Sequence, residues 1–267
     1  VKLGTAISYI FMRSPMLAAS AAMDIDELSG GRMILGLGVS GPQVVEGWYG
    51  QPYSKPVTRT RDYVDIIRQV LARQAPVTSD SEFYPMPYHG PGAWGMGKPL
   101  KSIVHPLRAD LPIFIGAEGP KNVEQTAEIA DGWLPLYYSP YRQEVYASQL
   151  RNARPGFEIP ALVLCNINDN LDEALYPVKA MLGFYIGGMG SKARNFHKEL
   201  MARMGFADEA EQIQELFFAG KRDEAIALVP DAFADEISLS GPRDRIKEKL
   251  RDWENSPVTS LLINGDT

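Results

Sequence analysis

The stretch Gly31–Pro52, GRMILGLGVSGPQVVEGWYGQP, decides the fold. Its apolar run at 33–38 predicts a buried strand, because the run is four to eight residues long and lies between turn residues. The run breaks abruptly into Val39-Ser40-Gly41-Pro42-Gln43, where a glycine lets a ligand approach the backbone closely. A strand that ends in a loop of small residues is where α/β proteins bind ligands. A plain strand-to-loop transition would show the same local pattern, so both interpretations stay open here.

The length and composition indicate a globular chain. Its 267 residues are 45% apolar and 22% charged, and that length suits a single α/β barrel. The net charge of -6 argues against nucleic acid or an anionic membrane as partner, since both call for a basic face. No run approaches 18 apolar residues and no signal peptide is visible, so we expect a cytoplasmic protein. The one cysteine, Cys165, excludes a disulfide framework and is expected to be a buried, inert thiol.

Strand and helix patterns alternate along the chain, which predicts parallel pairing with right-handed crossovers. A doubly wound sheet is the competing architecture, but the GxGxxG turn that it would place after the first strand is absent. Six strands with long insertions favour an incomplete (β/α)8 barrel. Strands are expected at 1–8, 33–38, 111–117, 133–137, 159–167 and 258–263, and helices at 14–28, 58–72, 122–130, 140–152, most of 171–229 and 242–254.

Residues 76–110 interrupt this alternation. They are rich in proline, glycine and aromatic residues and show no sustained periodicity. Loops of this length are uncommon and often serve as lids, although a surface excursion is an equally good interpretation.

An ordered set of short segments makes the sequence more specific than any single motif. The set resembles the bacterial-luciferase-like superfamily, and most of all its branch that uses the deazaflavin coenzyme F420 in place of FMN. The similarity spans essentially the whole chain. Its segments are LGTA at 3–6, Ser14-Pro15, LSGGR at 28–32, LGLGVSGPQVVEG at 35–47, GAEGPK at 116–121 and ADGW at 130–133.

The resemblance implies a (β/α)8 barrel with the cofactor at the carboxyl ends of its strands. The first strand here corresponds to the third of the family, and the chain both begins and stops on a strand pattern. We therefore expect residues 1–267 to form a single incomplete barrel domain, lacking the first two βα units and the closing helix, with an insertion loop at about 76–110.

The resemblance also implies a cofactor site. A non-prolyl cis peptide at Ala6–Ile7 would bulge against the ring, and the loop after the second visible strand would follow the ring and ribityl chain. The loop at 116–122 would hold the phosphate, because a helix N-terminus offers unpaired N–H groups. The implied cofactor-binding residues are Ala6, Ile7, Val39, Ser40, Gly41, Gln43, Gly116, Ala117, Glu118, Gly119, Pro120 and Asn122.

Three further residues are candidates for the substrate pocket: Tyr9, Trp48 and His197. Each has a packing role as its alternative. No catalytic acid can be named, because related enzymes that oxidise sugar phosphates carry a glutamate where this chain has Ser40-Gly41-Pro42. Glu46 is nearby but fits a solvated surface better. No metal is expected, since the remaining histidines lack partners at ligand spacing.

The function implied by the resemblance is an oxidoreductase that exchanges hydride between coenzyme F420 and a small organic substrate. An FMN-dependent monooxygenase is the alternative enzyme, and a non-catalytic flavin-binding truncated barrel is the alternative outside catalysis. A homodimer is expected for the full-length protein, with no nucleic-acid or membrane partner.

Overall fold

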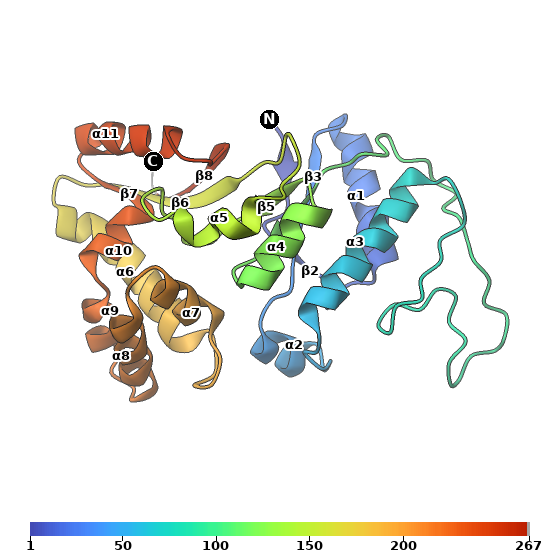
Figure 1. The fold of residues 1–267 in the computed structure, drawn as a ribbon, viewed down its shortest axis with the longest axis horizontal. Coiled ribbons are helices and arrows are strands. Elements are labelled where there is room, and N and C mark those ends of the chain that lie inside the picture. The colour runs from blue at the N-terminus through green and yellow to red at the C-terminus, as the bar shows by residue number, and fades with distance from the viewer. Residues whose placement is uncertain (266–267) are drawn as a thin grey trace. The chain divides into compact units, whose positions relative to one another are not determined.

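The structure is a computed structural model that describes residues 1–265. It contains two compact units, each built from alternating strands and helices (Figure 1). The first unit comprises residues 1–116 and 125–132, and the second comprises 117–124 and the chain from 133 onward.

The sheet of the first unit is built around β3 (Met33–Gly38), the strand predicted from the apolar run. Three strands pair with it in parallel: β1 (Leu3–Gly4), β2 (Ser8–Tyr9) and β4 (Ile113–Gly116). The interior of β3 is almost entirely buried, as expected for a strand of a parallel sheet.

The predicted first strand at 1–8 is interrupted, and the reason is the side chain of Thr5. Its Oγ1 donates to the carbonyl of Gly36 at 2.7 Å and accepts from the Gly36 N–H at 2.9 Å. The hydroxyl therefore takes the backbone partners that a continuous strand would have bonded, and two short strands result.

The helices of the first unit follow the predicted order with one addition. Helix α1 (Pro15–Ser29) is capped by Ser14, whose side chain accepts from Leu17 N–H, and ends at Gly30 in the left-handed region. Helix α3 (Pro56–Ala72) packs against α1. The short helix α2 (Pro42–Trp48) was not predicted, because the glycines and aromatics around it suggested a loop.

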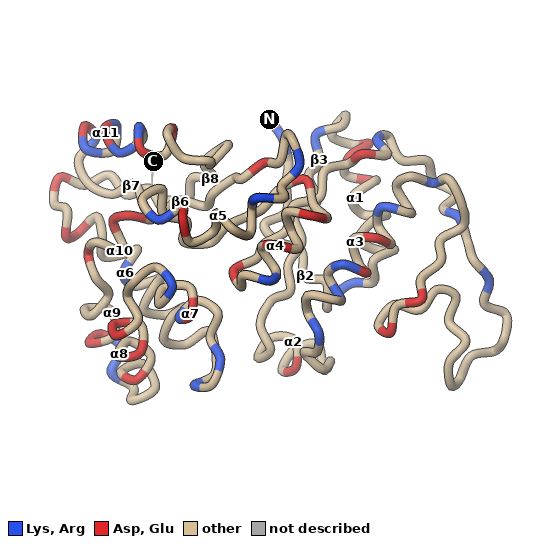
Figure 2. Tube along the Cα trace, viewed as in Figure 1, with Lys and Arg blue, Asp and Glu red and all other residues tan. Residues whose placement is uncertain are grey.

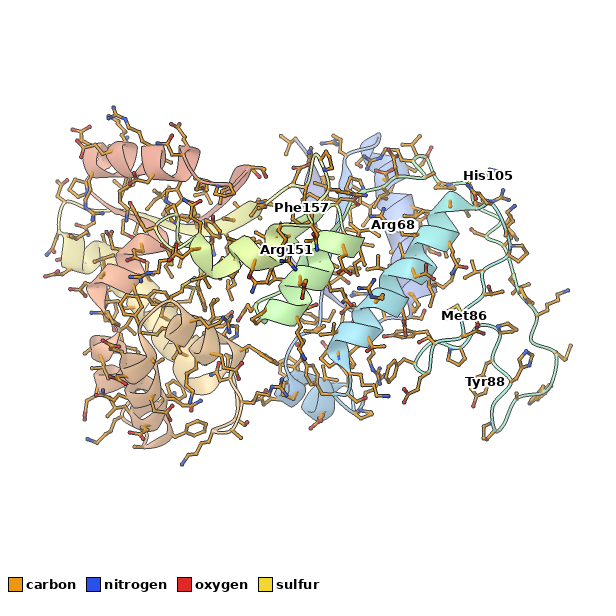
Figure 3. All side chains as sticks on the ribbon, viewed as in Figure 1. Arg68, Met86, Tyr88, His105, Arg151 and Phe157 are labelled. Carbon is orange, nitrogen blue, oxygen red and sulfur yellow. The ribbon has the colours of Figure 1, made fainter. Side chains whose placement is uncertain are left out.

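Residues 76–110 form no helix and no strand, as predicted. Two isolated bridges, Val77 with Leu100 and Ser79 with Met86, are the regular pairings within it. Met86, Tyr88 and His105 lie along this long loop in Figure 3.

The sheet of the second unit has β6 (Pro160–Ile167) between β7 (Ser238–Gly241) and β8 (Ser260–Asn264), all parallel. Strand β7 was missed, because its sequence SLSG carries a single large apolar residue although all four residues are buried. Strand β5 (Gly132–Leu134) is shorter than predicted.

Helices alternate with the strands of the second unit in the expected regions, and acidic and basic residues are interspersed along them (Figure 2). None of the helices within residues 1–265 is long and apolar enough to cross a membrane. Helix α10 was not predicted. The helices are α4 (Pro120–Ile129, which spans both units), α5 (Glu144–Leu150), α6 (Leu171–Gly188), α7 (Phe196–Arg203), α8 (Ala207–Phe218), α9 (Arg222–Leu228), α10 (Asp231–Glu236) and α11 (Arg243–Glu254).

Candidate functional site

In the first unit, the residues implied for the cofactor ring lie just before β2 and at the ends of β3 and β4. The Ala6–Ile7 peptide is cis. The side chain of Ile7 occupies the space above two glycines that pair across the sheet, Gly38 and Gly116. A Cβ on Gly38 would lie 1.7 Å from Ile7 Cδ1, and a Cβ on Gly116 would lie 3.3 Å from Ile7 Cγ2. With Ile7 in this position, a side chain at Gly38 would overlap it and one at Gly116 would be tightly packed against it.

In the loop after β3, backbone atoms are more accessible to a ligand than side chains are. Ser40 adopts a left-handed conformation with φ of 59°, and its carbonyl accepts from the Tyr53 hydroxyl at 3.4 Å. Gly41 precedes α2 without a capping side chain, and Gln43 is exposed on the first turn of that helix. This loop leaves the backbone around Gly41 free to approach a ligand.

The loop predicted to hold phosphate begins at the end of β4 and continues in the second unit. The buried carbonyl of Ala117 accepts from Trp133 Nε1 at 2.8 Å, and the Gly119 carbonyl accepts from Asn122 N–H at 2.9 Å. Pro120 takes the first position of α4, where its missing N–H costs nothing. A Cβ on Gly119 would meet no atom within 4 Å, so space beside this loop is open.

Glu118 turns its carboxylate toward α7 of the same unit. Its Oε1 lies 3.0 Å from His197 Nδ1, a distance that makes an ion pair when the imidazole is protonated, although the two groups are not aligned as a hydrogen bond. Both side chains are 16% exposed. The main-chain carbonyl of Glu118 accepts from Arg203 Nη2 at 2.8 Å. One residue of the predicted loop is therefore contacted twice by one helix.

Aromatic rings enclose the imidazole of His197. The ring of Tyr185 lies edge-on at 5.0 Å between centroids and that of Tyr137 at 5.9 Å. Burial raises the pKa of Tyr137 well above its ordinary value, and the charges of Glu118 and Tyr185 raise it further. Its hydroxyl, which has no hydrogen-bond partner within the described chain, therefore stays protonated.

The sequence did not single out Tyr137, Tyr185 or Arg203. Tyr137 has a left-handed backbone, with φ of 56°, and lies beyond the end of β5 at Leu134, although the strand was predicted to run to residue 137. No spacing in the sequence relates Arg203 to Glu118, which precedes it by 85 residues.

The three predicted pocket residues lie in different surroundings. Tyr9 is half-buried in β2, opposite Gly38. Trp48 ends α2 with 81% of its surface exposed. His197 contacts Glu118, one of the predicted cofactor residues, so it has a partner that a lone structural histidine would lack.

One other side chain differs from expectation. Cys165 is half-buried and not fully buried. Within residues 1–265 no group of three or more histidine, cysteine, aspartate or glutamate side chains has the spacing of a metal site, and His105 lies on the long loop (Figure 3).

Parallel strands alternating with helices, and glycine-rich loops at the strand ends, define an α/β protein of the class that binds ligands at the carboxyl ends of its strands. Residues 1–260 match the family model described as luciferase-like monooxygenase. The chain belongs to this family.

The relatives include several proteins named for coenzyme F420. A protein of Mycobacterium tuberculosis with the provisional name coenzyme F420-dependent oxidoreductase is 47% identical over 99% of this chain and 79% of its own length. The 5,10-methylenetetrahydromethanopterin reductase of Archaeoglobus fulgidus is 28% identical over 99% of this chain and 77% of its length.

Solved structures show the same fold. The coenzyme F420-dependent tetrahydromethanopterin reductase of Methanopyrus kandleri superposes with a TM-score of 0.76 at 24% identity, covering 100% of this chain and 77% of that one. An F420-dependent secondary alcohol dehydrogenase gives 0.73 at 14% identity over 99% and 74%. The predicted α/β class with parallel strands is confirmed, without a closed barrel among the described residues.

Proposed function

We propose that this chain is an oxidoreductase that transfers hydride between coenzyme F420 and a small organic substrate. The relative at 47% identity carries that cofactor in its name, and a second relative is named as a reductase. The observation that carries the proposal is the packing of Ile7 over Gly38 and Gly116 at the ends of the paired strands β3 and β4, which would place an apolar side chain against a flat ring.

The described residues fit such a cofactor. When bound, the deazaflavin ring accepts or donates the hydride. Ile7 and the backbone of Val39–Gly41 would contact the ring in the first unit. The phosphate contact implied for the 116–122 loop is part of the same proposal, supported by the open space beside Gly119 and by the positive end of the helix dipole at the start of α4.

The substrate remains proposed only as a small organic molecule, with Tyr9, Trp48 and His197 as the candidate contacts. A homodimer is part of the same proposal, and sedimentation equilibrium of the purified protein tests it.

Titration of the protein with coenzyme F420 and, separately, with FMN tests the proposal. Fluorescence of each cofactor reports binding directly. We expect saturable binding of coenzyme F420 at micromolar concentration or below, about -8 kcal/mol or better. Tight binding of FMN with no affinity for coenzyme F420 would favour the monooxygenase instead, and binding of neither would contradict both assignments.

A further inference from the structure

Helix α7 contacts the predicted phosphate loop at two separate atoms of Glu118. His197 lies beside the carboxylate and Arg203 donates to the main-chain carbonyl. We propose that α7 is a clamp on this loop, with His197 and Arg203 as positioning residues that hold residues 117–120 in the conformation that binds the cofactor. The identity of the ligand rests on the proposed function. The contacts that form the clamp lie within the second unit and do not depend on that identity.

The start of α7 is fixed relative to the end of α6 by the hydrogen bonds of one side chain, Asn195. Asn195 caps α7 by accepting from His197 N–H at 3.0 Å and Lys198 N–H at 3.1 Å. The amide nitrogen of the same side chain donates to the carbonyls of Tyr185 and Ile186 at 3.1 and 2.7 Å. Asn195 is 1% exposed, so these bonds are protected from water. The position of His197 is thereby fixed through the backbone.

The imidazole is also fixed in its rotation. Tyr185 of α6 and Tyr137, in the segment between β5 and α5, contact it edge-on with interplanar angles of 81° and 69°. A ring held in this way cannot turn from the Glu118 carboxylate without disturbing both contacts. The geometry therefore favours one arrangement of the pair.

When His197 holds the Glu118 carboxylate in place, the neighbouring backbone can bind an anion more easily. A free carboxylate on this loop would repel a phosphate and compete for the N–H groups at the start of α4. His197 engages the carboxylate, and Arg203 adds a positive charge next to the loop. The backbone of 117–120 is then left for the ligand.

Hydrogen exchange of the ligand-free protein tests the clamp. In His197→Ala and Arg203→Ala, we expect the amides of residues 118–123 to exchange about tenfold faster, as loss of one such contact implies. His197→Gln keeps a polar side chain beside the Glu118 carboxylate and should exchange more slowly than His197→Ala. Glu199→Gln, at an exposed position of the same helix, is the matched control and should exchange like the wild type.

A double variant separates the clamp from loss of packing around His197. If the two residues act through each other, Glu118→Ala combined with His197→Ala should speed exchange no more than either change alone. Unchanged exchange at 118–123 in the single variants, or a His197→Gln variant no better than His197→Ala, would overturn the clamp.

The second arm is titration of the same variants with coenzyme F420. We expect about tenfold weaker binding in His197→Ala and Arg203→Ala, near-wild-type binding in His197→Gln, and no change in Glu199→Gln. A wild type that binds no coenzyme F420 refutes the proposed function, while the exchange measurement still decides the clamp. A wild type that binds, with variants that bind equally well, contradicts the role of the clamp in binding.

Discussion

The contact between Ile7 and Gly38 shows how one missing side chain shapes a candidate ring site. An added methyl group at Gly38 would overlap Ile7 Cδ1, and one at Gly116, on the neighbouring strand, would lie 3.3 Å from Ile7 Cγ2 and 3.4 Å from its Cδ1. The two glycines therefore both leave room for the side chain of Ile7.

For Gly38→Ala we expect a loss of about 1–3 kcal/mol in the free energy of unfolding, because the methyl group overpacks the strand ends. Urea denaturation measures it. Ile7→Val removes the overlapping Cδ1, so Gly38→Ala combined with Ile7→Val should be more stable than Gly38→Ala. An additive double variant would show that the two side chains do not compete for this space.

Asp26 is a buried charge with one dominant partner. It is 1% exposed, and Arg108 donates to its two carboxylate oxygens at 2.5 and 3.0 Å. The Arg108 hydrogen bond lowers the pKa of Asp26 against the opposing effect of burial, and the N–H of Met33 lowers it further. The folded protein therefore holds this carboxylate ionised.

Because the folded pKa of Asp26 is lowered, its stabilising effect is complete above the ordinary pKa of about 4 and is lost as the pH falls through the lower folded value. Asp26→Asn should cost about 3 kcal/mol at pH 7, and its deficit relative to the wild type should shrink as the pH drops below about 4. Urea denaturation across this range measures both. Asp24→Asn, at an exposed position of α1, is the control, and an equal deficit at every pH would contradict the ion pair as the cause.

At the level of single residues, the sequence predicted the loops of the candidate site but not the side chains around them. Gly41 and Gly119 were predicted as cofactor contacts because glycines in the loop after a strand can be recognised in the sequence. Arg203 and Tyr137 carry no such sequence signal. The hydrogen bond of Arg203 and the backbone angle of Tyr137 are defined only in the folded chain.

The elements of the fold were predicted where hydrophobic periodicity was strong. Helices α1 and α3 lie within two residues of the predicted bounds at each end. Strand β7 and helices α2 and α10 were missed, since each is short and none carries a sustained apolar pattern. The single strand predicted at 1–8 is wrong because of a tertiary contact. The Thr5 hydroxyl occupies the backbone groups of Gly36 that a continuous strand would have bonded.

The long loop is the element most open to proteolysis. Arg108 anchors its end to the first unit through Asp26, whereas Trp94 near its middle is 92% exposed. We expect chymotrypsin to cleave first after Trp94, because a protease needs an extended segment free of regular hydrogen bonds. Mass spectrometry of early digests identifies the cut. Trp94→Ala should remove it, and first cleavage beside the buried Trp133 would contradict this view of the loop.

At the scale of the whole molecule, the proposed cofactor should stabilise the fold. A ligand that binds only the native state adds about 2.7 kcal/mol at one hundred times its dissociation constant. We expect coenzyme F420 to raise the melting temperature by several degrees at such a concentration, and FMN at the same concentration to raise it less. Differential scanning calorimetry measures the shift, and an equal or larger effect of FMN would favour the alternative cofactor.

The family assignment and the α/β class could both be predicted from the sequence, because the ordered motifs extend over almost the entire chain. The division into two compact units could not, since it depends on which long-range contacts form.

The distribution of tryptophan has a practical consequence. Trp48 and Trp94 belong to the first unit and are 81% and 92% exposed, whereas Trp133 and Trp253 belong to the second and are 0% and 2% exposed. Iodide, which does not enter protein interiors, should therefore quench emission from the first unit and spare that from the second. The chain thus carries an intrinsic optical label for each unit, and loss of structure in the second can be followed without adding a dye.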